Sequence, residues 1–263
     1  MIRFATAALA LTGAAFAQAP SPEDQRAFLE KARAVALAYS NLLPDFVCTE
    51  VIERSSDEFG SMRFLDTLEV QLTYAQKKED YKLILGGKVS NLPLESYWGA
   101  LSFGEFGSTV RGIFEPQSRT EFRWEKAAET KKSRTYVYSY RVPRASSRFT
   151  LAHKLETERV AAIGLRGRLE IDAETGMVLR LTADADEIPA DFPVLQSKRV
   201  IEYAFVDVGG RRYLLPARAE TQMSTLSHRR SRANYVNYRN AVQFRAYRKF
   251  EVESTVNFGD DIK

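Results

Sequence analysis

Apolar and polar side chains alternate along several long stretches of the chain, and this period of two constrains the fold more than any other feature. The clearest stretch runs from residue 242 to residue 258, where the even positions are apolar: Val242, Phe244, Ala246, Phe250, Val252, Val256 and Phe258. The odd positions between them are mostly polar. Such a pattern predicts antiparallel strands with one face covered and the other in water.

The same alternation predicts strands over residues 68–74 and 136–142, and two hairpins follow from turn residues. The pair Gly209-Gly210 separates the strand-like segments 199–208 and 211–220, and two glycines suit a tight turn in which both residues have positive φ. The segment Asp172–Gly176 joins residues 165–171 to residues 177–183 in the same way. A mostly antiparallel β protein is therefore expected.

One amphipathic helix is expected ahead of the strands, over residues 22–43. Ser21 provides a capping hydroxyl, Pro22 suits the first helical position, and the acidic Glu23 and Asp24 face the positive end of the helix dipole. Apolar residues then recur with a helical period until Pro44: Phe28, Ala32, Val35, Ala36, Tyr39, Leu42 and Leu43.

The stretch 86–118 shows no sustained alternation and is rich in glycine and aromatic residues. We expect a short helix around residues 94–101 and a lid-like loop over an opening of the sheet, because long irregular segments in compact domains often cover binding sites. An insertion that simply plugs the sheet is an equally good interpretation.

The start of the chain resembles a secretory signal peptide over residues 1–17. Arg3 precedes a short apolar stretch, and Ala15-Phe16-Ala17 offers a cleavage site. We therefore expect a periplasmic or secreted protein, cleaved near Ala17, with residues 18–263 as one curved antiparallel β domain. Because no Cys lies near the cleavage site for a lipid anchor, a soluble mature chain is expected, and not an integral membrane protein. The single Cys48 cannot form an internal disulfide and is expected to be buried.

Signatures of catalysis are missing. The two histidines, His153 and His228, have no metal-ligating neighbours at a suitable spacing, and no nucleophile elbow, phosphate loop or dinucleotide motif occurs. Asp184 and Asp186 are interpreted as part of a solvated connection, with a hydrolase as a distant alternative. Glu50 and Glu53 are assigned to the wet edge of a strand. A non-enzymatic protein without metal or cofactor is expected, and 38 basic against 34 acidic residues is too mild an excess to imply nucleic acid.

Aromatic residues suggest a ligand-binding groove, because they share strand faces at i, i+2 spacing. On a curved sheet they would line an apolar cavity, and ordinary core packing is the alternative interpretation. The candidate groove residues are Phe122, Trp124, Tyr136, Tyr138, Tyr140, Trp98, Phe103, Tyr203 and Phe205. A basic loop tip with Arg229, Arg230 and Arg232 is a candidate contact for a partner or for lipid headgroups.

The later half of the chain resembles the periplasmic lipoprotein-carrier superfamily, which includes LolA/LolB-like carriers and RseB-like sensors. The resemblance rests on the hairpin over residues 167–180 and on Arg212-Tyr-Leu-Leu-Pro216, which is similar to the following strand of that family. It implies a strongly curved, half-open β-barrel, of the α+β class, whose concave face is covered by helices and loops and receives acyl chains.

Two functions compete at this level. The first is binding of a lipid or acylated protein in a curved β groove. The second is an envelope protein-interaction or stress-sensing module with a filled core. The identity of the ligand, the oligomeric state, and the presence of a cavity are not determined by these patterns.

Overall fold

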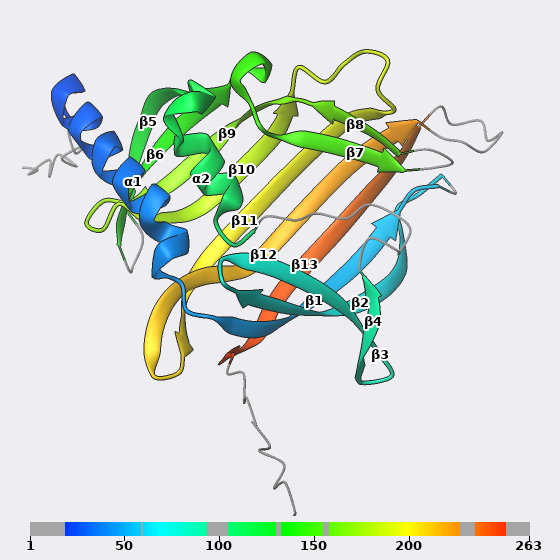
Figure 1. Cartoon of the computed structure of the whole chain (residues 1–263). Coiled ribbons are helices and arrows are strands. Elements are labelled where there is room, and N and C mark those ends of the chain that lie inside the picture. The colour runs from blue at the N-terminus through cyan, green and yellow to red at the C-terminus, as the bar shows by residue number, and fades with distance from the viewer. Residues whose placement is uncertain are drawn as a thin grey trace, which may run out of the picture.

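A computed structural model describes residues 19–58, 60–93, 105–129, 133–154, 158–226 and 235–250. Two α-helices, α1 (Pro22–Leu42) and α2 (Ser108–Phe114), and two short 3-10 helices, η2 (Pro116–Ser118) and η3 (Arg144–Ser146), accompany thirteen strands (Figure 1). The strands are β1 (Phe46–Ser56), β2 (Arg63–Ala75), β3 (Lys78–Leu85), β4 (Lys88–Pro93), β5 (Glu121–Glu129), β6 (Arg134–Val142), β7 (Thr150–Lys154), β8 (Glu158–Ala162), β9 (Gly164–Asp172), β10 (Val178–Asp186), β11 (Val194–Val208), β12 (Arg211–Leu226) and β13 (Tyr235–Lys249). The expected signal peptide lies outside the described residues.

Eleven of the strands form one antiparallel sheet in the order β4-β3-β2-β1-β13-β12-β11-β10-β9-β6-β5, and β7 and β8 pair separately. The sheet is curved and not closed into a barrel, since β4 and β5 remain as its two edges. Both α-helices lie on its concave face (Figure 1). The expected fold class, a mostly antiparallel α+β protein with a curved, half-open sheet, is confirmed. No helix in the described ranges is long and apolar enough to cross a membrane.

Helix α1 begins as the sequence predicts. The Ser21 hydroxyl accepts a hydrogen bond from the Asp24 amide at 3.1 Å, the Asp24 carboxylate returns the interaction, and Pro22 occupies the first turn. This reciprocal arrangement is a capping box. Only Ala32 and Ala36 of α1 are fully buried, and larger side chains such as Phe28 and Tyr39 pack against the core while partly buried.

Pairs of glycines form two of the tight turns between neighbouring strands. One of these pairs, Gly86-Gly87, lies in the stretch that was expected to be irregular. Gly209 and Gly210 turn between β11 and β12 with φ of +61° and +81°, as predicted. Gly86 and Gly87 also form a two-residue turn, with φ of +55° and +76°, between β3 and β4. The first part of the stretch 86–118 therefore forms a turn and the strand β4. Its later part contains the helix α2. The helix expected around residues 94–101 lies outside the described residues.

The even-position alternation near the C-terminus breaks at Ala246. Between the pairs Val47↔Arg248 and Thr49↔Arg245, β13 contains one residue more than β1, and Ala246 adopts a positive φ of 55°. This β-bulge turns Ala246 outward and brings Tyr247 to the core. Residues 251–258 of the predicted alternation lie outside the described residues.

Candidate functional site on the concave face of the sheet

A continuous row of apolar side chains crosses the concave face of the sheet. Its members are Cα partners in successive strands from β2 to β5, so they lie side by side. All of them are buried except the half-buried Trp124. This apolar row consists of Leu68, Ile52, Val242, Ala219, Ile201, Leu181, Leu169, Tyr138 and Trp124.

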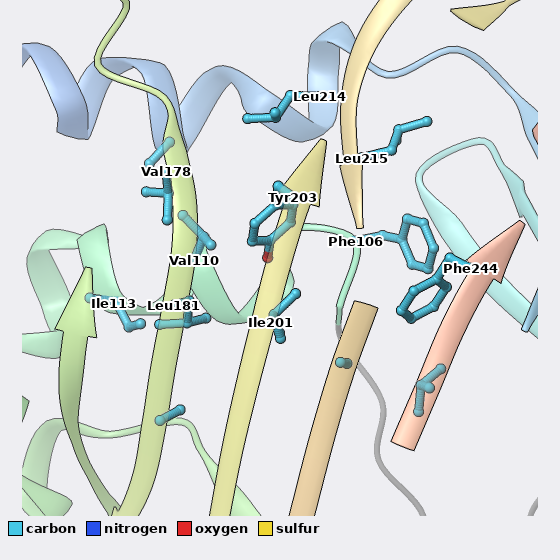
Figure 2. Packing of buried hydrophobic residues seen from close by; sticks show 14 of the residues in the cluster. Phe106, Val110, Ile113, Val178, Leu181, Ile201, Tyr203, Leu214, Leu215 and Phe244 are labelled. Atoms are coloured by element: carbon cyan, nitrogen blue, oxygen red, sulfur yellow. The ribbon is translucent and has the colours of Figure 1, made fainter. Parts of the chain in front are cut away.

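The helices and the segment before α2 cover this face through aromatic and aliphatic contacts. Phe28 of α1 packs edge-on against Tyr136 at 4.7 Å between ring centroids, and Phe114 of α2 stacks on Phe122 at 5.1 Å. Phe106 fills the space beside Phe244 at 5.4 Å. Figure 2 shows Val110 and Ile113 of α2 among side chains of the strands in this layer.

Tyrosine hydroxyls attach this cover to the rest of the protein. Tyr39 of α1 donates a hydrogen bond to the Leu214 carbonyl at 2.6 Å, and Tyr203 of β11 donates to the Glu105 carbonyl at 3.1 Å. Tyr138 donates to the Gln25 carbonyl of α1 at 3.3 Å. Burial raises the pKa of Tyr138 to about 12 and raises the pKa of Tyr203 further. These hydroxyls therefore remain donors at any physiological pH.

A second row, polar in character, lies beside the apolar row. On each strand it lies two residues from the apolar row, on the same face and always on the same side of that row. Its members are again Cα partners across five strands from β2 to β11. This polar row consists of Asp66, Arg54, Asn240, Thr221 and Arg199. Arg54, Asn240 and Thr221 are buried, with exposures of 2%, 4% and 5%. Over these five strands the concave face therefore changes from apolar to polar between the two rows.

Buried acidic groups lie where the covering segment meets the sheet. Glu50 of β1 is 4% exposed, and its Oε1 has no hydrogen-bond partner among the residues that the structure describes. Burial, followed by the charges of Glu105 and Glu79, raises the pKa of the Glu50 carboxyl. Glu105, 2% exposed, forms an ion pair with Arg199 at 3.7 Å. The raised pKa favours a neutral Glu50.

The assignment of Glu50 and Glu53 to one wet strand edge was wrong for Glu50. The two residues are three apart, so in a strand they face opposite sides, and only Glu53 is exposed. The signal that identifies Glu50 was present in the sequence, since it shares even positions with Phe46, Cys48 and Ile52, all of which are buried. Cys48 is buried as expected, and burial raises the pKa of its thiol.

The structure brings together several of the aromatic residues that the sequence analysis singled out. Trp124 packs against Tyr136 at 5.1 Å and Tyr138 at 5.3 Å, while Tyr140 is buried and donates its hydroxyl to the Thr182 carbonyl. With Phe122 they form part of the layer that contacts the helices. Trp98, Phe103, Arg229, Arg230 and Arg232 lie outside the described residues.

Tyr203 and Phe205 do not share an environment, although their spacing suggested it. Tyr203 is 9% exposed and Phe205 is 46% exposed, with the Arg212 guanidinium 5.3 Å from the Phe205 ring centroid. The pairing of β11 with β12 shifts register between Glu202 and Tyr203. The side chains nearer the tip of this hairpin, Phe205 among them, therefore face a different side from the one that simple alternation predicts. Strand alternation therefore does not extend across this point.

A crevice of about 610 Å³ opens where β10 and β11 stop pairing, beyond the pair Asp184↔Lys198. It is lined by Arg166, Asp184, Ala185, Leu195, Gln196, Ser197, Lys198, Ser224, Tyr235 and Asn237. Asp186, the other acid of the suggested pair, forms an ion pair with Arg141 at 3.0 Å. Among the described residues, no group of three or more His, Cys, Asp or Glu side chains is placed to hold a metal ion.

No protein-family model and no curated protein sequence matches the chain. Among solved structures, a likeness is found to a LolA superfamily protein from Nitrosomonas europaea, with 10% sequence identity and a TM-score of 0.37. The matched region spans 86% of this chain and 94% of the other chain. A putative outer membrane lipoprotein-sorting protein domain from Vibrio parahaemolyticus is 10% identical with a TM-score of 0.36, covering 88% and 94%. The MucA/MucB complex of Pseudomonas aeruginosa matches at 10% identity and a TM-score of 0.21, covering 85% and 100%. Each of these likenesses extends over most of this chain, at 10% sequence identity.

Proposed function

We propose that the chain is a non-enzymatic, periplasmic or secreted binding protein that holds the acyl chain of a lipid or acylated protein on its concave face, beneath α1 and α2. The observation that carries this proposal is the apolar row, which crosses nine strands of a sheet that does not close. Residues on this row are covered by separate helical elements rather than by a second sheet.

Helix α1 contacts the sheet through side chains and is not part of its strand pairing. It inserts Ala32 and Ala36 fully into the core, and Phe28 and Tyr39 pack against the core as partly buried side chains. Displacing α1 breaks these side-chain contacts, whereas displacing a strand also breaks a ladder of backbone hydrogen bonds. The aromatic layer of Phe122, Trp124, Tyr136, Tyr138 and Tyr140 would then contact the acyl chain.

A reversible lock on α1 tests the proposal. An ideal Cβ on Gly176, in the turn between β9 and β10, would lie 3.5 Å from the Cα of Ala32. The double variant Ala32→Cys/Gly176→Cys is therefore expected to form a disulfide that joins α1 to the turn. Uptake of a fluorescent fatty acid should fall in the oxidised protein and return after reduction, whereas each single variant should bind in both conditions.

Two results would contradict the proposal. The first is a folded wild-type protein that binds no fatty acid probe and carries no lipid in native mass spectrometry. The second is an oxidised double variant, with its disulfide confirmed by mass, that takes up the probe as fast and as tightly as the reduced form. The second result would place any acyl site away from α1.

Docking of a protein segment is a second candidate function, favoured by the crevice between β10 and β11. Two basic side chains, Arg166 and Lys198, line it together with the exposed Leu195 and Tyr235. The loop with Arg229, Arg230 and Arg232 remains part of this proposal. It predicts salt-sensitive binding of an acidic peptide that Lys198→Glu weakens and that the α1 lock leaves unchanged.

A further inference from the structure

The polar row lies within reach of any ligand that occupies the apolar row. The two rows are two residues apart along each strand, which is about 6.6 Å at the rise of a β-strand. Ile52 is followed by Arg54 on β1, and Ala219 is followed by Thr221 on β12. An acyl chain on the first row would therefore place its headgroup near the second.

The charged members of the polar row are already paired with each other or with the covering segment. The Arg54 guanidinium donates two hydrogen bonds to the Asp66 carboxylate, at 2.7 and 2.6 Å. Arg199 forms its ion pair with Glu105. Each of these two pairs is neutral in itself, so a charged headgroup beside them would bring a further charge into a desolvated site.

Two buried hydroxyls beside these pairs have no partner among the described residues. Thr221 Oγ1 belongs to the polar row, and Ser56 Oγ lies two residues beyond Arg54 on β1. Their residues are 5% and 2% exposed. Buried polar atoms in proteins nearly always have a partner, so unpartnered ones point to a missing water or ligand group. A hydroxyl both donates and accepts, and it therefore suits a neutral polar group.

We propose that the polar row is a headgroup subsite for a neutral, hydroxyl-rich lipid headgroup, such as glycerol or a sugar. This inference rests on the proposed acyl-binding function. Thr221, which lies between Asn240 and Arg199 in the row, binds one headgroup hydroxyl, while the Asp66 carboxylate supplies a further acceptor. Tyr238 and Met223, which are Cα partners in the next row, are half-buried, so the burial of the face decreases on that side.

Three probes with the same chain and different headgroups test the subsite: 1-dodecanoylglycerol, dodecanoate and dodecyl phosphate. Each is titrated against wild-type protein loaded with a fluorescent fatty acid. We expect the glycerol ester to displace the fatty acid at an about tenfold lower concentration than the two anions, the effect of roughly two additional hydrogen bonds. Thr221→Val keeps the shape of the side chain without its hydroxyl. It should reduce the preference for the glycerol ester about fivefold and leave the affinity for dodecanoate unchanged.

Thr135→Val is the matched control, because Thr135 is also buried but lies on β6, where its hydroxyl already donates to the Ala128 carbonyl. It should not alter the preference. Equal affinity for the glycerol ester and dodecanoate, or a Thr221→Val variant that weakens all three probes alike, overturns the subsite and leaves acyl binding intact. Tightest binding of dodecyl phosphate overturns it in favour of an anion site. If no probe binds, both the subsite and the proposed function fail.

Discussion

The hydroxyl of Tyr203 on β11 donates a hydrogen bond to the main-chain carbonyl of Glu105, 3.1 Å away, and so joins the middle of the sheet to the segment that leads into α2. The same segment packs Phe106 against the paired strands β1 and β13, where its ring contacts Phe46 and Phe244. One side-chain atom of the sheet thus helps to hold the cover over the apolar row.

Tyr203→Phe removes this hydrogen bond and keeps the ring. We expect the variant to lose about 1 kcal/mol of stability, because a buried hydrogen bond is lost. Amide hydrogen exchange of α2 should accelerate more than that of β11, since the lost contact restrains the cover. Tyr213→Phe is the control, as the Tyr213 hydroxyl makes no hydrogen bond to any residue in the described ranges. Equal exchange in wild type and Tyr203→Phe would show that the contact does not restrain α2.

Glu50 should make the protein less stable as the pH rises. Burial raises its pKa in the folded state above the unfolded value, so the stabilising contribution is fully present below the ordinary carboxyl pKa and is lost as pH rises through the folded pKa. Glu50→Gln should therefore show a flatter urea-unfolding profile between about pH 5 and 8 than the wild type. Glu53→Gln, on the exposed side of β1, should leave the profile unchanged. Parallel profiles for wild type and Glu50→Gln would contradict the assignment.

Thr221→Val should stabilise the protein in the absence of ligand. The substitution removes a buried hydroxyl that lacks a partner, which is expected to add about 1 kcal/mol to the free energy of unfolding. Thr135→Val removes a hydroxyl that is hydrogen-bonded and should cost about 1 kcal/mol. Chemical denaturation of the two variants compares them directly, and destabilisation by both would mean that the Thr221 hydroxyl has a partner in solution.

Gly107 should tolerate no side chain. A Cβ at this position would lie 2.5 Å from Cδ1 of the Tyr39 ring, and the residue has a φ of +103°. Gly107→Ala is therefore expected to destabilise the protein by about 2 kcal/mol or more, through both backbone strain and the displacement of Tyr39. Gly210→Ala has a positive φ of 81° but no atom within 4 Å, so it isolates the backbone contribution of about 1 kcal/mol. Thermal melts that give equal losses would exclude the contact with Tyr39 as a cause.

Local patterns in the sequence were sufficient for the elements themselves. The capping residues at Ser21 and Asp24 define the start of α1, and the pair Gly209-Gly210 defines a hairpin, because each depends on interactions between near neighbours. The bulge at Ala246 could not be predicted, since it depends on how β13 pairs with β1. The polar row escaped detection for the same reason. Its residues, from Arg54 to Asn240, become neighbours only through the order of the strands.

The pairing of β1 with β13 joins the first and the last strand of the described residues, as in the partnership of Ile52 with Val242. A chain that emerges from its N-terminus cannot complete the middle of this sheet until the final strand has arrived. Contacts between such distant parts of a sequence slow folding, because the loop must close before the contacts stabilise it. The topology therefore delays completion of the sheet until β13 is present, and until then β1 and β12 have unpaired edges that can pair with other chains.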